Sequence, residues 1–201
     1  MMTGRNDPST YEPLPWQVDA WRDCSPVVLL TGAAGGGKSR LAAEKMHGYM
    51  LRYPGARGLL VRKAREYATK SMVLTMQSVI AGTDAASYSK SDLMFYYTNG
   101  SRVAVAGVKD EDQREALRSI FEDGAVDMAW IEEANALSYE AFQEIRLRMR
   151  GTAASWRQLI LTTNPDGPAH WIKRKLIDGG LAAVYYSGAK DNPNLPDSYI
   201  A

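Results

Sequence analysis

The stretch Gly32-Ala33-Ala34-Gly35-Gly36-Gly37-Lys38-Ser39 decides the fold class of this 201-residue chain. It fits the pattern G-x-x-x-x-G-K-[ST], and it lies between the apolar run at residues 27–30 and a segment with an apolar stripe at helical spacing. Glycines let successive backbone N–H groups curl around phosphate oxygens, and the positive end of the following helix faces the same oxygens. Lys38 adds charge for the β- and γ-phosphates, and Ser39 offers a hydroxyl to Mg²⁺. A flexible linker would not lie between a buried strand and an amphipathic helix, so the pattern predicts a nucleotide-phosphate site.

Composition and charge are those of an ordinary globular protein. The chain is 45% apolar and 23% charged, with a net charge of +1, so any binding to nucleic acid must come from local patches or from several subunits together. No run reaches the ~18 apolar residues of a membrane span, and the N-terminus lacks a signal-peptide pattern. We expect a cytoplasmic protein with no membrane partner, and an inert, buried thiol at the single cysteine, Cys24.

Strand-like and helix-like segments alternate after a polar, proline-rich arm that we expect over residues 1–15. The predicted strands lie at residues 27–31, 58–62, 95–98, 102–105, 125–131, 158–163 and 182–186. The predicted helices lie at residues 39–53, 66–80, 138–149 and 168–179. The Asn99-Gly100 dipeptide predicts an inserted β-hairpin. This alternation predicts one α/β domain over residues 16–190, with a mainly parallel central sheet and helices on both faces.

Two adjacent acids, Glu132 and Glu133, directly follow the apolar run at residues 128–131. Phosphoryl transfer needs a carboxylate on Mg²⁺ and a group that orients or deprotonates the attacking water. We assign Glu132 to the metal and Glu133 to the water; the alternative is an acidic turn that caps the next helix. Asp127 is the rival metal ligand, but it precedes the apolar run, where a solvated strand start is the better interpretation. The acid pair and the intervening strands favour a RecA-like (ASCE) P-loop ATPase.

Four segments taken together resemble the ATPase domain of a tailed-bacteriophage large terminase. They are Pro15-Trp16-Gln17, the phosphate loop, Trp130-Ile131-Glu132-Glu133-Ala134 and Leu161-Thr162-Thr163-Asn164-Pro165. Arg118-Ser119 and the Asp-Asn-Pro-Asn-Leu-Pro sequence at residues 191–196 are also similar to that family's pattern. The resemblance covers about residues 12–201, and it therefore extends over the whole predicted domain.

This resemblance implies an ATP-driven motor that translocates double-stranded DNA into a procapsid. The implied partners are the portal protein, the small terminase subunit and further copies of the chain, which form a ring on the portal. The expected location is the host cytoplasm and, transiently, the portal vertex. The family also has a C-terminal RNase H-like nuclease, which would begin at about the point where this sequence stops. We therefore expect residues 191–201 to begin a linker, and no nuclease residues in this segment.

The resemblance also assigns roles to single residues. Gln17 would read adenine, Thr163 and Asn164 would sense loss of the γ-phosphate, and Arg118 would stabilise the transition state because the phosphate loop has no arginine. The expected catalytic residues are Lys38, Arg118 and Glu133, and the expected metal ligands are Ser39 and Glu132. The expected nucleotide-binding residues are Gln17, Gly32, Ala33, Ala34, Gly35, Gly36, Gly37, Lys38, Ser39, Arg40 and Asn164. The cofactors are ATP and Mg²⁺. The runner-up arginines are Arg146, Arg148 and Arg150, of which Arg146 and Arg150 are expected to share a helix face at i, i+4.

The DNA contacts and two alternative functions stay open. Residues 173–175, residues 62–63 and the polar loop at residues 83–92 are candidate DNA contacts, and for each of them solvated surface is an equally good interpretation. A P-loop kinase or phosphotransferase would need an acceptor substrate. A nucleotide-gated assembly module would bind ATP with little hydrolysis. The adjacent pair Glu132 and Glu133 argues against both alternatives.

Overall fold

An eight-stranded sheet forms the centre of the molecule in the computed structural model, which describes residues 11–196. The strands are β1 (Val27–Gly32), β2 (Arg57–Arg62), β3 (Ala86–Ser89), β4 (Met94–Tyr97), β5 (Arg102–Gly107), β6 (Met128–Glu132), β7 (Gln158–Thr163) and β8 (Ala183–Ser187). Their spatial order is β3-β4-β5-β2-β6-β7-β1-β8. Only the β3–β4 and β4–β5 pairs are antiparallel among the paired strands of residues 11–196. The predicted α/β class and the inserted hairpin are confirmed.

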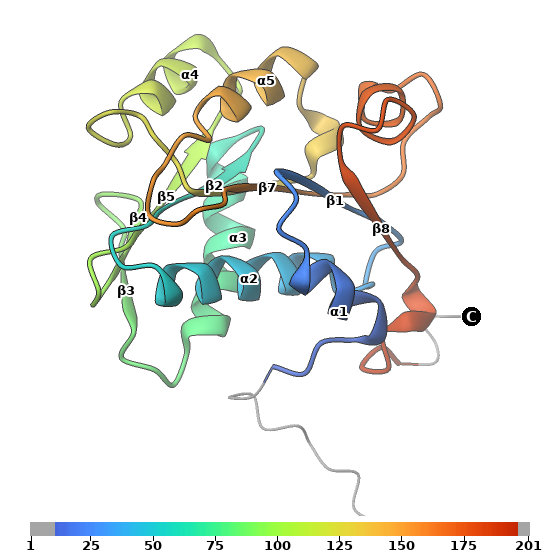
Figure 1. The fold of residues 1–201 in the computed structure, drawn as a ribbon, viewed down its shortest axis with the longest axis horizontal. Helices are drawn as coiled ribbons and strands as arrows, with labels where there is room; N and C mark the ends of the chain where they lie inside the picture. Colours follow the sequence, from blue (N-terminus) through green and yellow to red (C-terminus); the bar gives the residue numbers. More distant parts are fainter. Residues whose placement is uncertain (1–10, 197–201) are drawn as a thin grey trace, which may run out of the picture.

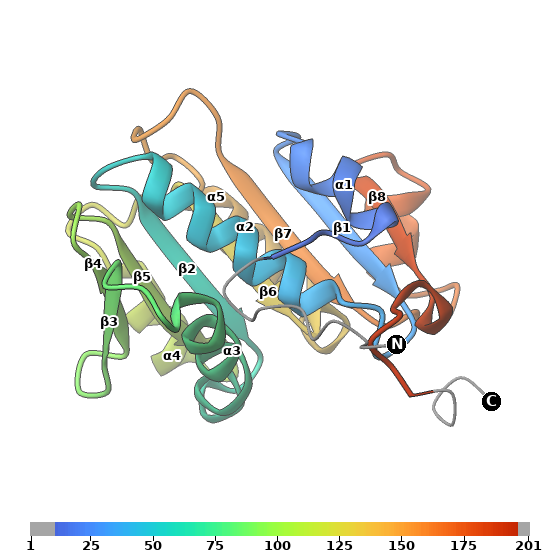
Figure 2. The ribbon, with the colours of Figure 1, turned by 90° about the horizontal axis from the view of Figure 1, so that it is seen from below.

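Helices cover both faces of this sheet (Figures 1 and 2). The α-helices are α1 (Pro15–Arg22), α2 (Lys38–Arg52), α3 (Arg65–Ile80), α4 (Glu111–Arg118) and α5 (Tyr139–Leu147). Two 3-10 helices, η1 (Ala134–Ala136) and η3 (Ala189–Asp191), and one π-helix, η2 (Ile172–Ile177), complete the set of helices in the described part of the chain. The α1, α2 and α3 helices lie on one face, and α4, α5 and η2 lie on the other.

Alternation along the strands divides the core into two layers. Along β1, Val28 and Leu30 pack into the layer beneath α2 and α3, whereas Val27 and Leu29 pack into the layer beneath α5. This is the period of two that a strand buried on both sides requires. The strands of the central parallel block all run the same way, so their carboxyl ends lie at one edge of the sheet, where ligands of such folds bind. The phosphate loop leaves β1 at this edge.

Four elements differ from the sequence prediction, and each difference has a local cause. The α4 helix was not predicted because its sequence is mostly charged and buries only Leu117, although Asp110 caps it by accepting a hydrogen bond from the Gln113 N–H. The α1 helix and β3 were not predicted either, because α1 buries only Gln17 and Ala20 and β3 is a short polar edge strand. The predicted helix at 168–179 was placed too early, because the chain forms a turn at residues 167–170 before the π-helix begins.

Two further expectations were wrong. Cys24 is exposed rather than buried, because it lies between α1 and β1 before the chain enters the sheet. Arg150 lies beyond the end of α5, so it does not form a helical i, i+4 pair with Arg146. Most of the predicted arm at residues 1–15, and the last part of the predicted linker at residues 191–201, lie outside the described residues. No helix in residues 11–196 is long and apolar enough to cross a membrane.

Candidate active site

The phosphate loop connects β1 to α2 in a tight curl. Gly35 has a φ of 78° and Gly37 a φ of 84°, and both lie in the left-handed region that glycine enters without steric cost. Gly37 is also the N-cap of α2, so the curl delivers the chain directly into the positive end of that helix. The sequence pattern therefore produces the cradle of N–H groups that anions occupy at helix N-termini.

A cleft of about 680 Å³ opens at the carboxyl edge of the sheet beside this loop. Its lining comes from the phosphate loop, from the ends of β2, β6 and β7, from α3, and from the segment after β8. The lining residues outside residues 34–40 are Arg62, Ser71, Glu132, Glu133, Asn135, Ala136, Thr162, Thr163, Asn164, Asn192 and Leu195. Residues that are distant in the sequence thus meet at one edge because the strands that carry them are parallel neighbours.

Lys38 points into the loop that precedes it. Its Nζ donates to the Gly32 and Ala33 carbonyl oxygens at 2.8 and 2.6 Å and to Asn164 Oδ1 at 3.2 Å. The side chain is buried, and desolvation lowers the pKa of its ammonium group. A buried cation held only by neutral oxygens is suited to exchange them for the charged oxygens of a triphosphate. Its contact with Asn164 joins the phosphate loop to the end of β7.

Ser39 and Glu132 are brought into direct contact, as the predicted metal site requires. Ser39 Oγ donates to Glu132 Oε1 at 3.1 Å, and Ser71 Oγ of α3 donates to Glu132 Oε2 at 2.6 Å. A hydroxyl and a carboxylate form the hard oxygen donor set that Mg²⁺ takes when phosphate oxygens and water complete its shell. The described residues contain no group of three or more His, Cys, Asp or Glu side chains that could hold a metal by themselves. These residues therefore fit Mg²⁺ delivered with a nucleotide.

Glu133 pairs with Arg62. Its φ of 51° is in the left-handed region, and its side chain is 57% exposed. Arg62 Nε donates to Glu133 Oε2 at 3.1 Å, and Arg62 Nη2 pairs with Glu133 Oε1. Arg62 Nη1 lies 3.7 Å from Glu132 Oε2 and donates to Ser71 Oγ at 2.9 Å. The hydrogen bond to Glu133 raises the pKa of Arg62, so one guanidinium holds both acids of the cleft.

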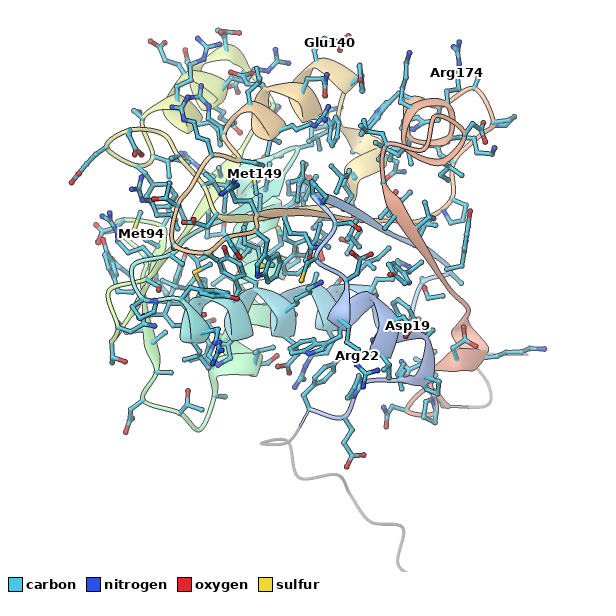
Figure 3. All side chains as sticks on the ribbon, in the orientation of Figure 1. Asp19, Arg22, Met94, Glu140, Met149 and Arg174 are labelled. Carbon is cyan, nitrogen blue, oxygen red and sulfur yellow. The ribbon has the colours of Figure 1, made fainter. Side chains whose placement is uncertain are left out.

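Sequence reasoning missed this role of Arg62 and considered it only as a DNA contact. The side chain is 16% exposed and lies inside the cleft, which leaves little of it for a DNA backbone. The sequence shows only that Arg62 ends a strand; its place beside Glu132 depends on β2 being the neighbour of β6. In contrast, Arg174 projects outward from η2 (Figure 3).

Gln17 lies behind the phosphate loop. Its Nε2 donates to the Gly37 carbonyl oxygen at 3.0 Å, and its Oε1 accepts from Tyr11 Oη and the Leu14 N–H, both at 2.8 Å. The side chain is 2% exposed and does not line the cleft. Gln17 therefore joins α1 to the start of α2, and its predicted contact with adenine stays a prediction. Arg40 lines the cleft and pairs with Glu44.

Arg118 lies outside the cleft. It is exposed at the end of α4, where Nε donates to Glu144 Oε1 at 3.0 Å and Nη2 lies 3.5 Å from Glu111 Oε1. The hydrogen bond to Glu144 raises the pKa of Arg118. None of Arg146, Arg148 and Arg150 lines the cleft either. Arg40 and Arg62 already line this site, whereas these four arginines could reach a nucleotide only from another subunit or after a rearrangement.

Asp127 lies at the opposite edge of the sheet from Glu132, so it is not a metal ligand of the cleft. The expectation that it is solvated was wrong. Asp127 is 1% exposed, and its carboxylate accepts from the backbone N–H groups of Arg57 and Ala153, both at 2.9 Å. These bonds satisfy a buried charge and tie the start of β2 to the loop before β7.

Comparisons of the sequence with known proteins give matches to phage terminase large subunits. A family model described as phage terminase large subunit matches residues 26–201. The PBSX phage terminase large subunit of Bacillus subtilis (strain 168) is 28% identical over 196 residues, which cover 86% of this chain and 43% of that protein. The chain thus spans less than half the length of this curated relative.

Solved structures share the fold at low sequence identity. The large terminase of a thermophilic bacteriophage superposes with a TM-score of 0.76 at 16% identity, over 93% of this chain and 48% of that one. The complex of the same terminase with ATP-gamma-S gives a TM-score of 0.74 at 12% identity, over 92% and 47%. The ATPase domain of the Thermus phage P74-26 large terminase gives 0.60 at 14% identity, over 90% and 81%.

Proposed function

This chain belongs to the phage terminase large subunit family, and from that premise we propose that it is the ATP-hydrolysing motor domain of a DNA-packaging terminase. Its hydrolysis of ATP would be coupled to translocation of double-stranded DNA into a procapsid. The observation that carries the proposal is the contact between Ser39 of the phosphate loop and Glu132, with Glu133 beside it at the mouth of the same cleft. Phosphate binding, a metal ligand and a water-directed acid are then present in one place.

Each residue of the cleft has a task in this proposal. Lys38 and the N–H groups of the phosphate loop bind the phosphates, and Ser39 and Glu132 hold Mg²⁺. When bound, Mg²⁺ neutralises charge on the phosphate oxygens. Glu133 accepts a proton from the attacking water at a lone pair that its two contacts with Arg62 do not use. Asn164, in contact with Lys38, carries the state of the site into β7.

We assign the transition-state arginine to a neighbouring subunit, with Arg118 as the first candidate. The phosphate loop of this chain contains no arginine, and Arg118 is exposed on α4. An arginine supplied in trans raises hydrolysis by about 10³ to 10⁵ in related enzymes. Assembly into a ring on the portal protein, with DNA and the small terminase subunit as further partners, would place the finger. The work would take place in the host cytoplasm and at the portal vertex.

Phosphate release measured with and without double-stranded DNA, at several protein concentrations, tests the proposal. We expect Mg²⁺-dependent release that rises with protein concentration and disappears in Lys38→Ala. ADP formation only in the presence of an added acceptor, with the phosphate bound to that acceptor and not released, would identify a phosphotransferase instead. Tight ATP binding without release under assembling conditions would identify a nucleotide-gated assembly module.

Mixing two inactive variants tests the finger separately. Arg118→Ala keeps an intact cleft, and Glu133→Gln keeps an intact Arg118. Recovered activity in co-assembled mixtures shows that Arg118 acts in trans. No recovery, despite demonstrated co-assembly, would direct attention to Arg146, Arg148 and Arg150.

A further inference from the structure

The segment that follows β8 contacts the phosphate loop. Asn192 Nδ2 donates to the Gly35 carbonyl oxygen at 2.7 Å, across a sequence separation of 157 residues. Both Asn192 and Leu195 line the nucleotide cleft. A segment near the end of the described chain thus contacts the loop that holds the phosphates.

The Asn192 amide is itself held in one orientation. Its Oδ1 accepts from the Asn194 N–H at 3.1 Å, which leaves Nδ2 directed at Gly35. The turn before it is fixed by Asp191, whose Oδ2 accepts from the Gly188 N–H at 2.6 Å. An acceptor oxygen and a donor nitrogen that each have a partner make a preorganised contact rather than a chance surface bond.

Ser187 of β8 supports the same loop from behind. Its carbonyl oxygen accepts from the Ala33 N–H at 3.0 Å. A Cβ atom at Gly36 would lie 2.6 Å from Ser187 Oγ and 2.9 Å from Ser187 Cβ, so only glycine fits against this strand. The loop is therefore fixed to β8 at Ala33 and packed against it at Gly36, and the peptide between Gly35 and Gly36 is held by Asn192 alone among the described hydrogen bonds.

We propose that Asn192 is a positioning residue for the phosphates, acting through the Gly35–Gly36 peptide. The C=O and N–H of a trans peptide point in opposite directions. A hydrogen bond that fixes the Gly35 carbonyl therefore also fixes the Gly36 N–H of the same peptide, and we expect this N–H to be one of those that phosphate oxygens accept from. Because Gly35 has no side chain to restrict rotation of this peptide, the Asn192 amide supplies the restriction.

The contact between Asn192 and the phosphate loop must act in both directions, because binding equilibria at coupled sites are thermodynamically linked. If Asn192 favours the phosphate-binding form of the loop, bound phosphates must in turn favour the closed arrangement of residues 188–196. Nucleotide binding would then order the segment through which the chain leaves the domain. This inference rests on the proposed function, because it takes a phosphate-bearing nucleotide as the ligand of the cleft.

The first experiment compares Asn192→Ala with the matched variant Asn194→Ala. Asn194 is exposed in the same turn, and the contact recorded for it uses only its backbone N–H, so its side chain should be dispensable. A lost neutral hydrogen bond corresponds to about a threefold to tenfold loss of affinity. We expect Asn192→Ala to raise the Kd of ADP and the KM of ATP by that factor with kcat within about twofold, the pattern of lost ground-state binding.

Asn192→Asp provides a second test that does not create a cavity. It keeps the size of the side chain but presents a carboxylate oxygen to the Gly35 carbonyl, so affinity should fall at least as far as in Asn192→Ala. This variant decides the matter if Asn192→Ala does not fold. Unchanged ADP affinity in folded Asn192→Asp would overturn the proposal.

Amide hydrogen exchange distinguishes a positioning role of Asn192 from a merely structural one, because a structural role would not change how ADP affects exchange in residues 188–196. In the wild type, ADP should slow exchange across residues 188–196 as well as in the phosphate loop. In Asn192→Ala saturated with ADP, the loop should remain protected and residues 188–196 should lose their protection. Equal protection of residues 188–196 in both proteins would overturn the proposal and leave the motor function intact. Failure of the wild type to bind ADP would instead overturn the motor function.

Discussion

Replacing Glu133 with glutamine separates chemistry from binding in the cleft. Glutamine keeps the size of the side chain and one oxygen acceptor for Arg62, but it cannot accept a proton from water. Because Glu133 is 57% exposed, its pair with Arg62 contributes at most about 1 kcal/mol to stability. The fold and the phosphate loop should therefore be unaffected, and the effect should lie in the rate of hydrolysis.

The expected magnitude is that of a lost general base. Such groups contribute about 10² to 10⁴ to the rate, and a 10²-fold loss corresponds to roughly 2.7 kcal/mol in the activation free energy. ATP affinity should stay within about threefold, because none of the hydrogen bonds of Lys38 and Ser39 involves Glu133. A fall of less than about tenfold would be too small for a base.

Steady-state phosphate release and ADP-displacement binding measure the two quantities independently. Glu132→Gln is the informative partner, since Glu132 accepts hydrogen bonds from Ser39 and Ser71 and should affect Mg²⁺ dependence as well as rate. Glu66→Gln, in the exposed first turn of α3, is the control for a general effect of charge. Retained hydrolysis in Glu133→Gln combined with loss in Glu132→Gln would refute the assignment and reverse the two roles.

Three further outcomes follow from single contacts. Arg62→Ala should lower the Mg²⁺ concentration that half-saturates ATP hydrolysis by about fivefold or more, because a cation 3.7 Å from Glu132 contributes about 1 kcal/mol even in a water-like dielectric. A Mg²⁺ titration that does not shift contradicts this. Asp127→Ala should lower the free energy of unfolding, measured in urea, by about 2–4 kcal/mol, since two N–H groups lose a charged acceptor. Reduced ATP turnover per folded molecule would contradict this purely structural role and would again make Asp127 a candidate metal ligand. Burial lowers the pKa of Lys45 from 10.5 to about 8, so the unfolded chain binds more protons between these values. The unfolding free energy of the wild type relative to Lys45→Met should therefore rise from pH 8 to 10.5, and a flat difference across urea titrations at these pH values would argue against the shift.

The phosphate loop and its two flanking elements could be predicted because their signals are local. The motif at residues 32–39 requires a strand before it and a helix after it, and both form within a residue or two of the predicted bounds. The same holds for Glu132, since an acid at the end of a buried strand in this fold reaches the ligand edge. The Ser39–Glu132 contact was predictable for this reason, although 93 residues separate the two.

Arg62 and Asn192 could not be assigned from the sequence because their roles depend on strand order. Arg62 meets the acids only because β2 is the neighbour of β6, and Asn192 meets Gly35 only because β8 pairs with β1. Neither pairing joins consecutive strands. Hydrophobic periodicity fixes which face of a strand is buried but not which strand lies next to it.

The different environments of Glu132 and Glu133 argue for their division of roles more strongly than their order in the sequence does. Glu132 ends β6 facing the sheet edge, where two hydroxyl groups donate to its oxygens, and this ties it to Ser39 and the metal position. Glu133 takes a left-handed φ that costs a non-glycine residue on the order of 1 kcal/mol, and this turn directs its carboxylate to Arg62 at the cleft mouth. A straight strand end would have placed the second acid on the opposite face of the sheet, away from the nucleotide. The strained turn therefore keeps both carboxylates at one cleft, where Arg62 contacts both but only Glu132 accepts from hydroxyl groups. A pair of acids in unlike surroundings can hold a metal with one member and serve a water with the other.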